Sequence, residues 1–148
     1  MRLIVLVFLF LFVGMPAVSQ PPSGLTFHDA WTVPYGDNET PEYHIYGIMS
    51  NLTPKKDILL RAETPLGKSI VFETLRASAL KKIVVPVETL DIPAEQVIFY
   101  DPGRTRLSLK EPAKTLKVGD TFPLILTFRY AGIVKTTVDV KRCCGDIR

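Results

Sequence analysis

The sequence predicts an all-β domain, a sandwich or barrel built from about nine short strands. Turn residues are dense throughout, with 12 Pro and 9 Gly among 148 residues, and such punctuation is typical of strands rather than long helices. Near the C-terminus apolar and polar residues alternate over 122–128 and again over 134–140. Because successive side chains of a strand point to opposite faces, this period predicts a hairpin.

The first segment, residues 1–19, predicts a cleaved signal peptide. Arg2 precedes the unbroken apolar run Leu3–Val13, and the small residues Ala17 and Ser19 follow it. This is the pattern of a secretory signal, and the run is well short of the roughly 20 residues that a membrane-spanning helix needs. No Cys lies directly after the run, so a lipoprotein anchor is not expected. The segment predicts a periplasmic or secreted protein without a permanent membrane span.

Residues 20–24 form a short tail, residues 25–141 the β domain, and residues 142–148 a C-terminal tail. Short apolar runs between turn residues place the strands of the domain. In chain order the expected strands are 25–31, 43–50, 58–62, 69–75, 82–87, 96–100, 105–109, 122–128 and 134–140.

Charge and motifs exclude several classes of function. The chain has 18 basic and 15 acidic side chains, a balance too even for a nucleic-acid-binding protein. It has only two His and no nucleophile, zinc-protease or nucleotide motif, so we expect no enzyme. The scattered carboxylates are interpreted as solvent-exposed strand residues; they include Glu42, Glu63, Glu73 and Glu88.

The adjacent residues Cys143 and Cys144 are the only two cysteines in the sequence. Thiolates are soft ligands that suit Cu(I) or zinc, and in an oxidising compartment they also form disulfides. A bond between neighbouring residues is strained, which favours an intermolecular bridge. Three interpretations therefore remain: an accidental pair in a tail, a redox or intermolecular pair, and a metal site.

The order of several short segments resembles the periplasmic copper chaperone (PCuAC) family. The C-terminal half carries Pro102-Gly103, Leu107-Ser108-Leu109 and the run 116–128, followed by Ala131-Gly132 and Val138-Asp139-Val140. The N-terminal half carries Asp29-Ala30-Trp31 with Pro34, Tyr46 with Asn51, and Ile92-Pro93-Ala94. Together these segments span roughly 25–141.

The resemblance implies a cupredoxin-like Greek-key fold and a periplasmic protein that carries Cu(I) to a partner of the copper pathway. Family members bind Cu(I) with a His, a Met and a His-x-Met pair, ligands that suit this ion. The first His falls on Phe72, the first Met near Val84, and the pair on Arg106 and Ser108. None of these four residues is a usual copper ligand.

Two functional hypotheses follow. The first is an exported PCuAC-like interaction protein in copper handling that lacks the family's Cu(I) site. The alternative is an active copper chaperone that uses Cys143 and Cys144, or His44 and Met49, as ligands. His44 and Met49 are five residues apart, so a regular strand places them on opposite faces, and only a bulge would bring them together, with His28 as a third ligand.

Basic residues along 104–110 form a second candidate surface. Arg106, Ser108 and Lys110 share one face of the expected strand, and Arg104 lies close by. This cluster is a candidate contact for an anionic partner.

Overall fold

The computed structural model describes residues 24–35, 42–77 and 82–142. The expected signal peptide and both Cys lie outside these residues. Within them the chain is all strand and turn, with no helix. Accordingly, the described part contains no helix long and apolar enough to cross a membrane.

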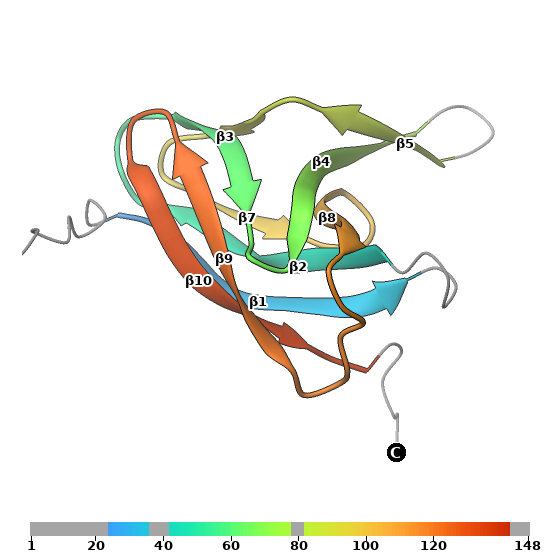
Figure 1. The fold of residues 1–148 in the computed structure, drawn as a ribbon. Helices are drawn as coiled ribbons and strands as arrows, with labels where there is room; N and C mark the ends of the chain where they lie inside the picture. The colour runs from blue at the N-terminus through green and yellow to red at the C-terminus, as the bar shows by residue number, and fades with distance from the viewer. Residues whose placement is uncertain (1–23, 36–41, 78–81, 143–148) are drawn as a thin grey trace, which may run out of the picture.

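Ten strands build the fold (Figure 1). Every expected strand is present, most of them longer than expected, and one three-residue strand, β6, is additional. The strands are β1 (Leu25–Tyr35), β2 (Glu42–Asn51), β3 (Asp57–Glu63), β4 (Gly67–Ala77), β5 (Lys82–Val87), β6 (Leu90–Ile92), β7 (Gln96–Tyr100), β8 (Thr105–Pro112), β9 (Thr121–Phe128) and β10 (Gly132–Val140).

All ten strands belong to one sheet that bends over its own apolar face. Its order is β5-β4-β8-β2-β1-β10-β9-β3-β6. The remaining strand, β7, pairs with the second half of β2, whereas β8 pairs with the first half. The first and last strands, β1 and β10, pair in parallel, with Trp31 opposite Asp139. The sheet is open, because β5 and β6 end it instead of pairing with each other. The all-β prediction of a barrel or sandwich is confirmed, with the sheet left unclosed.

Strand alternation explains which face is buried. In β9 the residues Phe122, Leu124, Leu126 and Phe128 are all 2% exposed or less, as the period of two requires. In β2 the odd-numbered residues Tyr43, Ile45 and Met49 belong to the same hydrophobic core. The even-numbered residues of β2 therefore face the outer side of the sheet, away from this core.

A bulge in β1 shifts its register against β2 between His28 and Trp31. Asp29 has a φ of 49°, a conformation that accommodates the extra residue. Gly47 lies opposite the bulge, where a Cβ atom would be 2.6 Å from Cζ of Phe27. The bulge places Trp31 opposite Tyr46, and their rings pack at a tilt of 47° with centroids 4.7 Å apart.

Asn51 links the end of β2 by hydrogen bonds to the β2–β3 connection and to the segment after β6. Its Nδ2 donates hydrogen bonds to the carbonyl oxygens of Lys55 and Pro93 at 2.9 and 3.0 Å. Its Oδ1 accepts from the backbone N–H of Thr53 at 3.1 Å and from the Thr53 hydroxyl at 2.7 Å. The side chain is fully buried, so it satisfies backbone groups that would otherwise lack partners in the interior.

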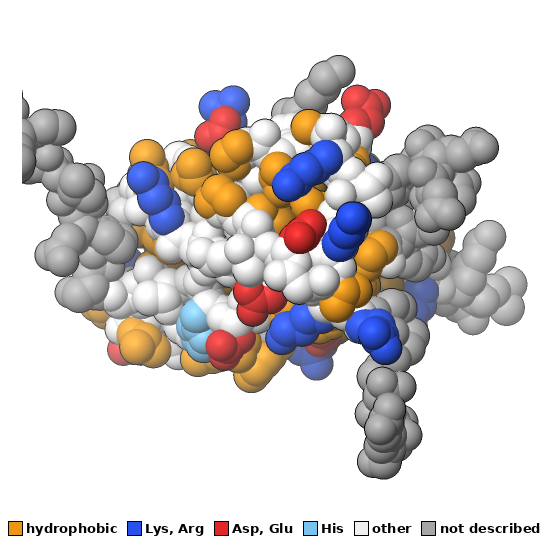
Figure 2. Space-filling view, turned by 60° about the horizontal axis from the view of Figure 1, so that its bottom comes forward, with side chains coloured by type: hydrophobic (Ala, Val, Ile, Leu, Met, Phe, Trp, Pro, Cys, Tyr) orange, Lys and Arg blue, Asp and Glu red, His pale blue; other side chains and the backbone are white. Residues whose placement is uncertain are grey.

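The outer surface has a mixed character. On the face drawn in Figure 2, basic and acidic side chains lie among one another with hydrophobic side chains between them. A functional site is therefore better sought in specific contacts than in the overall field of this face.

Candidate functional site: an outer-face ionic network

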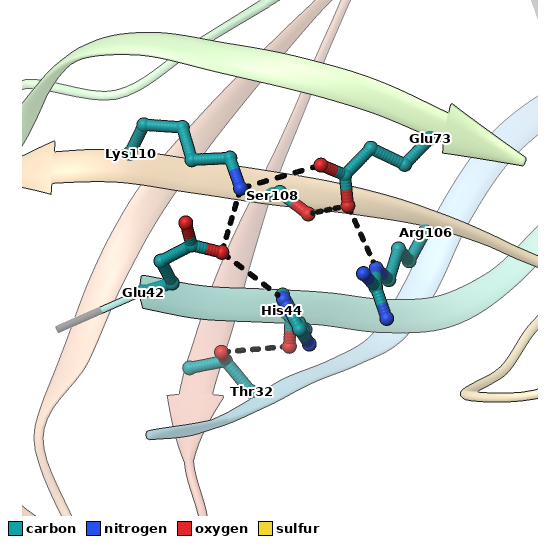
Figure 3. A network of polar contacts seen from close by, with 7 residues as sticks. All are labelled: Thr32, Glu42, His44, Glu73, Arg106, Ser108 and Lys110. Carbon is teal, nitrogen blue, oxygen red and sulfur yellow. Dashed lines mark hydrogen bonds and ion pairs between the residues drawn. The ribbon is translucent and has the colours of Figure 1, made fainter. Parts of the chain in front are cut away.

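Six polar side chains from three neighbouring strands converge on the outer face of the sheet (Figure 3). The register places His44 of β2 opposite Ser108 of β8, and Glu73 of β4 opposite Arg106 of β8. Residues two apart on a strand share a face, so the polar side chains of β2, β4 and β8 lie together on the outer face of the sheet. We call it the outer-face network; it consists of Glu42, His44, Glu73, Arg106, Ser108 and Lys110.

Glu73 is the centre of the network. Its Oε2 lies 2.8 Å from Nε of Arg106 and accepts a 2.6 Å hydrogen bond from the Ser108 hydroxyl. Its Oε1 lies 3.3 Å from Nζ of Lys110. The Glu73 side chain is 9% exposed, and a buried carboxylate requires such partners to remain charged.

Lys110 joins Glu73 to the second carboxylate of the network. Its Nζ donates to Oε2 of Glu42 at 2.6 Å, and the same oxygen lies 3.5 Å from Nε2 of His44. The His44 side chain is 2% exposed. Its backbone is also fixed, because the Thr32 hydroxyl donates to the His44 carbonyl oxygen at 2.8 Å.

The network shifts the pKa values of three of its members. Burial raises the pKa of Glu73, but the hydrogen bonds from Ser108, Arg106 and Lys110 together lower it below its usual 4.5. Burial lowers the pKa of Lys110, yet its contacts with Glu42 and Glu73 raise it above its usual 10.5. Burial and the charge of Arg106 lower the pKa of His44 below 6.5 despite both carboxylates.

The lowered pKa of Glu73 and the raised pKa of Lys110 keep these two groups charged at neutral pH, and the lowered pKa of His44 keeps its ring neutral. The network thus sets the carboxyl groups of Glu42 and Glu73 against the basic groups of Arg106 and Lys110. Arg and Lys already take up the carboxylate oxygens, which are hard donors that do not suit Cu(I). The residues present therefore do not fit a Cu(I) ion at this position. Nor do any three His, Cys, Asp or Glu within the described ranges form a group that could hold a metal.

Only two of the four positions that the resemblance implies as ligands, Arg106 and Ser108, lie together. Phe72 lies opposite Leu107 and is buried in the hydrophobic core, on the other face of β4. Glu73, one residue later, contacts both Arg106 and Ser108, and a shift of one residue reverses the face of a strand. Val84 lies on β5, opposite Leu75, and is 41% exposed.

His44 and Met49 do not form a joint site. His44 lies on the outer face with Glu42, whereas Met49 is 1% exposed within the hydrophobic core. The only register shift between β1 and β2 falls at His28–Trp31 of β1, so β2 keeps its alternation between the two residues. His28 contacts Asp29 and Ser50 instead, at 3.2 and 3.3 Å.

Two interpretations from the sequence are wrong on this face. The solvent-exposed assignment fails for Glu73, whose carboxylate is buried among its partners. Arg106 and Lys110 do not form a free basic surface, because Glu73 and Glu42 neutralise them. Arg104 is 75% exposed and lies 3.8 Å from Asp101, outside the network. A sequence signal for Glu73 existed: it follows Ile70, Val71 and Phe72, an apolar setting in which a carboxylate needs a cation.

Comparison with known proteins identifies the family of the chain. The family model described as "putative lipoprotein LpqE-like" matches residues 25–140, which include every described strand. The chain belongs to the LpqE-like family. A comparison with curated protein sequences finds no match.

Solved PCuAC domains share the fold of this LpqE-like chain. The copper-bound PCuAC domain from PmoF2 has a TM-score of 0.65 at 20% identity, covering 78% of this chain and 91% of that one. The apo PCuAC domain from PmoF1 also has a TM-score of 0.65, at 22% identity, covering 80% and 94%. The solution structure of CuI-DR1885 from Deinococcus radiodurans has a TM-score of 0.57 at 21% identity, covering 81% of each chain. The similarity to PCuAC domains and the cupredoxin-like β fold expected from the sequence are thereby confirmed.

Proposed function

We propose that this LpqE-like protein is exported and acts in copper handling by binding a protein partner, without catalysis and without Cu(I) at the outer-face network. One observation carries the second part of the proposal. Arg106 and Ser108, at the positions where the resemblance to PCuAC proteins places a His-x-Met pair, both contact the Glu73 carboxylate. A cation would have to displace a guanidinium and an ammonium from this carboxylate to enter.

The link to copper handling is supported by the fold. The LpqE-like chain shares its β architecture with PCuAC domains, two of them described as copper-bound or CuI forms. Export is supported by residues 1–19, whose apolar run and small residues have the pattern of a signal peptide. The family description speaks of lipoproteins, whereas this chain has no Cys before Cys143. We propose a periplasmic or secreted protein.

A second candidate function rests on the thiol pair. Cys143 and Cys144 are the softest ligands that the chain offers to Cu(I), and they would make it a copper carrier of a different design. Their place lies outside the described residues, beyond the end of β10 at Val140.

Competition for Cu(I) separates the two functions. The chain from Gln20 onward is titrated with Cu(I) against a competing chelator, as wild type and as Cys143→Ser/Cys144→Ser. The proposal expects the double variant to remove no Cu(I) from the chelator. Cu(I) bound by wild type alone would establish the thiol carrier. Cu(I) bound by the double variant, and lost on the further change His44→Gln, would overturn the proposal at the outer-face network.

A further inference from the structure

The end of the domain at which β1 begins carries the two most exposed large hydrophobic side chains of the described residues. Tyr130 is 72% exposed and Leu52 is 69% exposed, against 55% or less for every other such residue. Leu52 lies beside the start of β1, because its N–H donates to the carbonyl oxygen of Gly24 at 2.6 Å. The β2–β3 connection and the β9–β10 turn meet this start at the same end, on the left of Figure 1.

A shallow hollow of about 300 Å³ lies between these loops. Its wall is mostly apolar and includes Leu25, Pro54 and Tyr130, and Lys55 and Lys56 also line it. Both lysines are exposed, and so is Arg129. An apolar centre with basic side chains beside it is the composition of proteins that contact the interface of anionic membranes.

The acidic groups near this end do not cancel the basic ones. Asp57 is 4% exposed, and its carboxylate accepts the N–H groups of Tyr130 and Ala131 at 3.1 and 2.8 Å. Two exposed acidic side chains lie beside the loops: Glu95, whose N–H donates to the carbonyl oxygen of Thr53, and Asp91, which pairs with Ile58 of β3. The three exposed basic side chains Lys55, Lys56 and Arg129 outnumber these two by one.

Hydrogen bonds fix the backbone of the loops that carry the exposed side chains. Asp57 fixes the turn that carries Tyr130. The Lys55 carbonyl oxygen accepts from Nδ2 of Asn51 and from the Thr53 hydroxyl, both at 2.9 Å. This order reduces the entropy lost when the loops bind a surface.

The position of the apolar leader favours a membrane as the binding partner of this end of the domain. The apolar leader, residues 1–19, joins the domain through the five residues 20–24. Fully extended, these five residues span at most about 18 Å. This step rests on the proposed export: with residues 1–19 as the signal peptide, the end with Leu52 and Tyr130 is the part of the domain tethered nearest to the bilayer.

We propose that this end of the domain docks reversibly on an anionic phospholipid surface. Leu52 and Tyr130 enter the interface, and Lys55 and Lys56 contact the lipid phosphates. The contact is independent of copper and keeps the released domain near the membrane, with the outer-face network left free of it. The few apolar groups involved predict weak, salt-sensitive binding, because one hydrophobic contact alone gives only marginal affinity.

Vesicle sedimentation tests the proposal on the chain from Gln20 onward, which retains all ten strands. Wild type is expected to sediment with phosphatidylglycerol-containing vesicles, less so at high salt, and not with pure phosphatidylcholine vesicles. Leu52→Ser/Tyr130→Ser and, separately, Lys55→Gln/Lys56→Gln should each weaken the binding about tenfold. The matched control is Val97→Ser/Phe99→Ser, which removes two hydrophobic side chains of β7 that are 50% and 55% exposed.

Each outcome decides for or against the proposal. Failure of wild type to bind the anionic vesicles would overturn it and leave a protein partner as the occupant of this end. Equal weakening by the β7 control would also overturn it, since binding would then be nonspecific. If the Leu52/Tyr130 variant loses its thermal unfolding transition, the lysine variant decides alone.

Discussion

Nε of Arg106 lies 2.8 Å from Oε2 of Glu73, in an ion pair whose side chains are 15% and 9% exposed. This pair stands where the resemblance to copper chaperones places the His of a His-x-Met pair. The positive charge at this position is therefore the guanidinium of Arg106, and it is paired with the Glu73 carboxylate from the neighbouring strand β4. The outer faces of β4 and β8 are held together by the opposite charges of Glu73 and its two cations, Arg106 and Lys110.

Replacing Arg106 alone should destabilise the domain. Arg106→Met leaves the Glu73 carboxylate buried with only Ser108 and Lys110 as partners, and breaking a buried pair in this way costs about 3 kcal/mol of unfolding free energy. The measurement is urea denaturation at pH 7. Lys135→Met, at an exposed position of β10, is the control and should change the unfolding free energy by less than about 0.5 kcal/mol.

The double variant Arg106→Met/Glu73→Met distinguishes an ion pair from ordinary packing. Because an apolar pair of similar volume often replaces a buried ion pair without loss, the double variant should recover at least half of the stability that Arg106→Met loses. Losses that simply add across the double-mutant cycle would show that the two charges do not interact.

The neutral ring of His44 predicts a stability that falls in mild acid. Its pKa is lowered in the folded state by burial and by the charge of Arg106, so below pH 6.5 the unfolded chain binds more protons than the folded one. Stability is therefore complete above pH 6.5 and decreases as the pH falls toward the folded-state pKa, by at most about 1.4 kcal/mol per pH unit.

Unfolding free energies measured across pH 5–7 test this assignment. His44→Gln should reduce the slope, whereas His28→Gln, at a half-exposed side chain, should retain it. An unchanged slope in the His44 variant would mean that another group is responsible.

The sequence was sufficient for the fold because its signals are local. Alternation over 122–128 and 134–140 and the turn residues located nine of the ten strands, and the segment order revealed the similarity to PCuAC domains. The short strand β6 was missed, since its three residues Leu90, Asp91 and Ile92 are too few to show a period. The bulge at Asp29 was not predicted either, because the sequence pattern of this strand does not indicate a φ of 49° at that residue.

The site was predicted less well because its partners are distant in sequence. Arg106 and Ser108 were recognised as sharing a face, but the carboxylate that binds both lies more than 30 residues earlier, at Glu73. Placing it requires the register of β4 against β8 to a single residue, and a shift of one residue exchanges Glu73 for Phe72. Only the three-dimensional pairing distinguishes the two.

Asn51 should be among the costliest polar residues to remove. Asn51→Ala deprives the carbonyl oxygens of Lys55 and Pro93, and the N–H of Thr53, of their partner. Buried groups left without a hydrogen bond cost about 1–3 kcal/mol each, so we expect a loss of about 3 kcal/mol or more in thermal or urea unfolding. Gln96→Ala, at an exposed position of β7, is the control. A loss below about 1 kcal/mol for Asn51→Ala would mean that water replaces the side chain.

Gly47 should tolerate no side chain, because of its place opposite the bulge. A Cβ at this position would lie 2.6 Å from Cζ and 3.0 Å from Cε2 of Phe27, and 3.1 Å from the carbonyl oxygen of His28. Phe27 is 3% exposed and packs edge-on against Tyr100, so its ring has little room to move. Gly47→Ala should therefore cost about 2 kcal/mol of unfolding free energy through overpacking.

The same substitution in a Phe27→Leu background isolates the contact. Leu lacks the ring atoms that the new methyl group would meet, so Gly47→Ala should cost less there than in wild type, by about 1 kcal/mol. Gly103→Ala is the matched control, since a Cβ at that exposed turn meets only the Asp101 carboxylate, at 3.1 Å. An equal cost of Gly47→Ala in both backgrounds would locate the strain in the backbone of the bulge, at His28, instead of in the Phe27 ring.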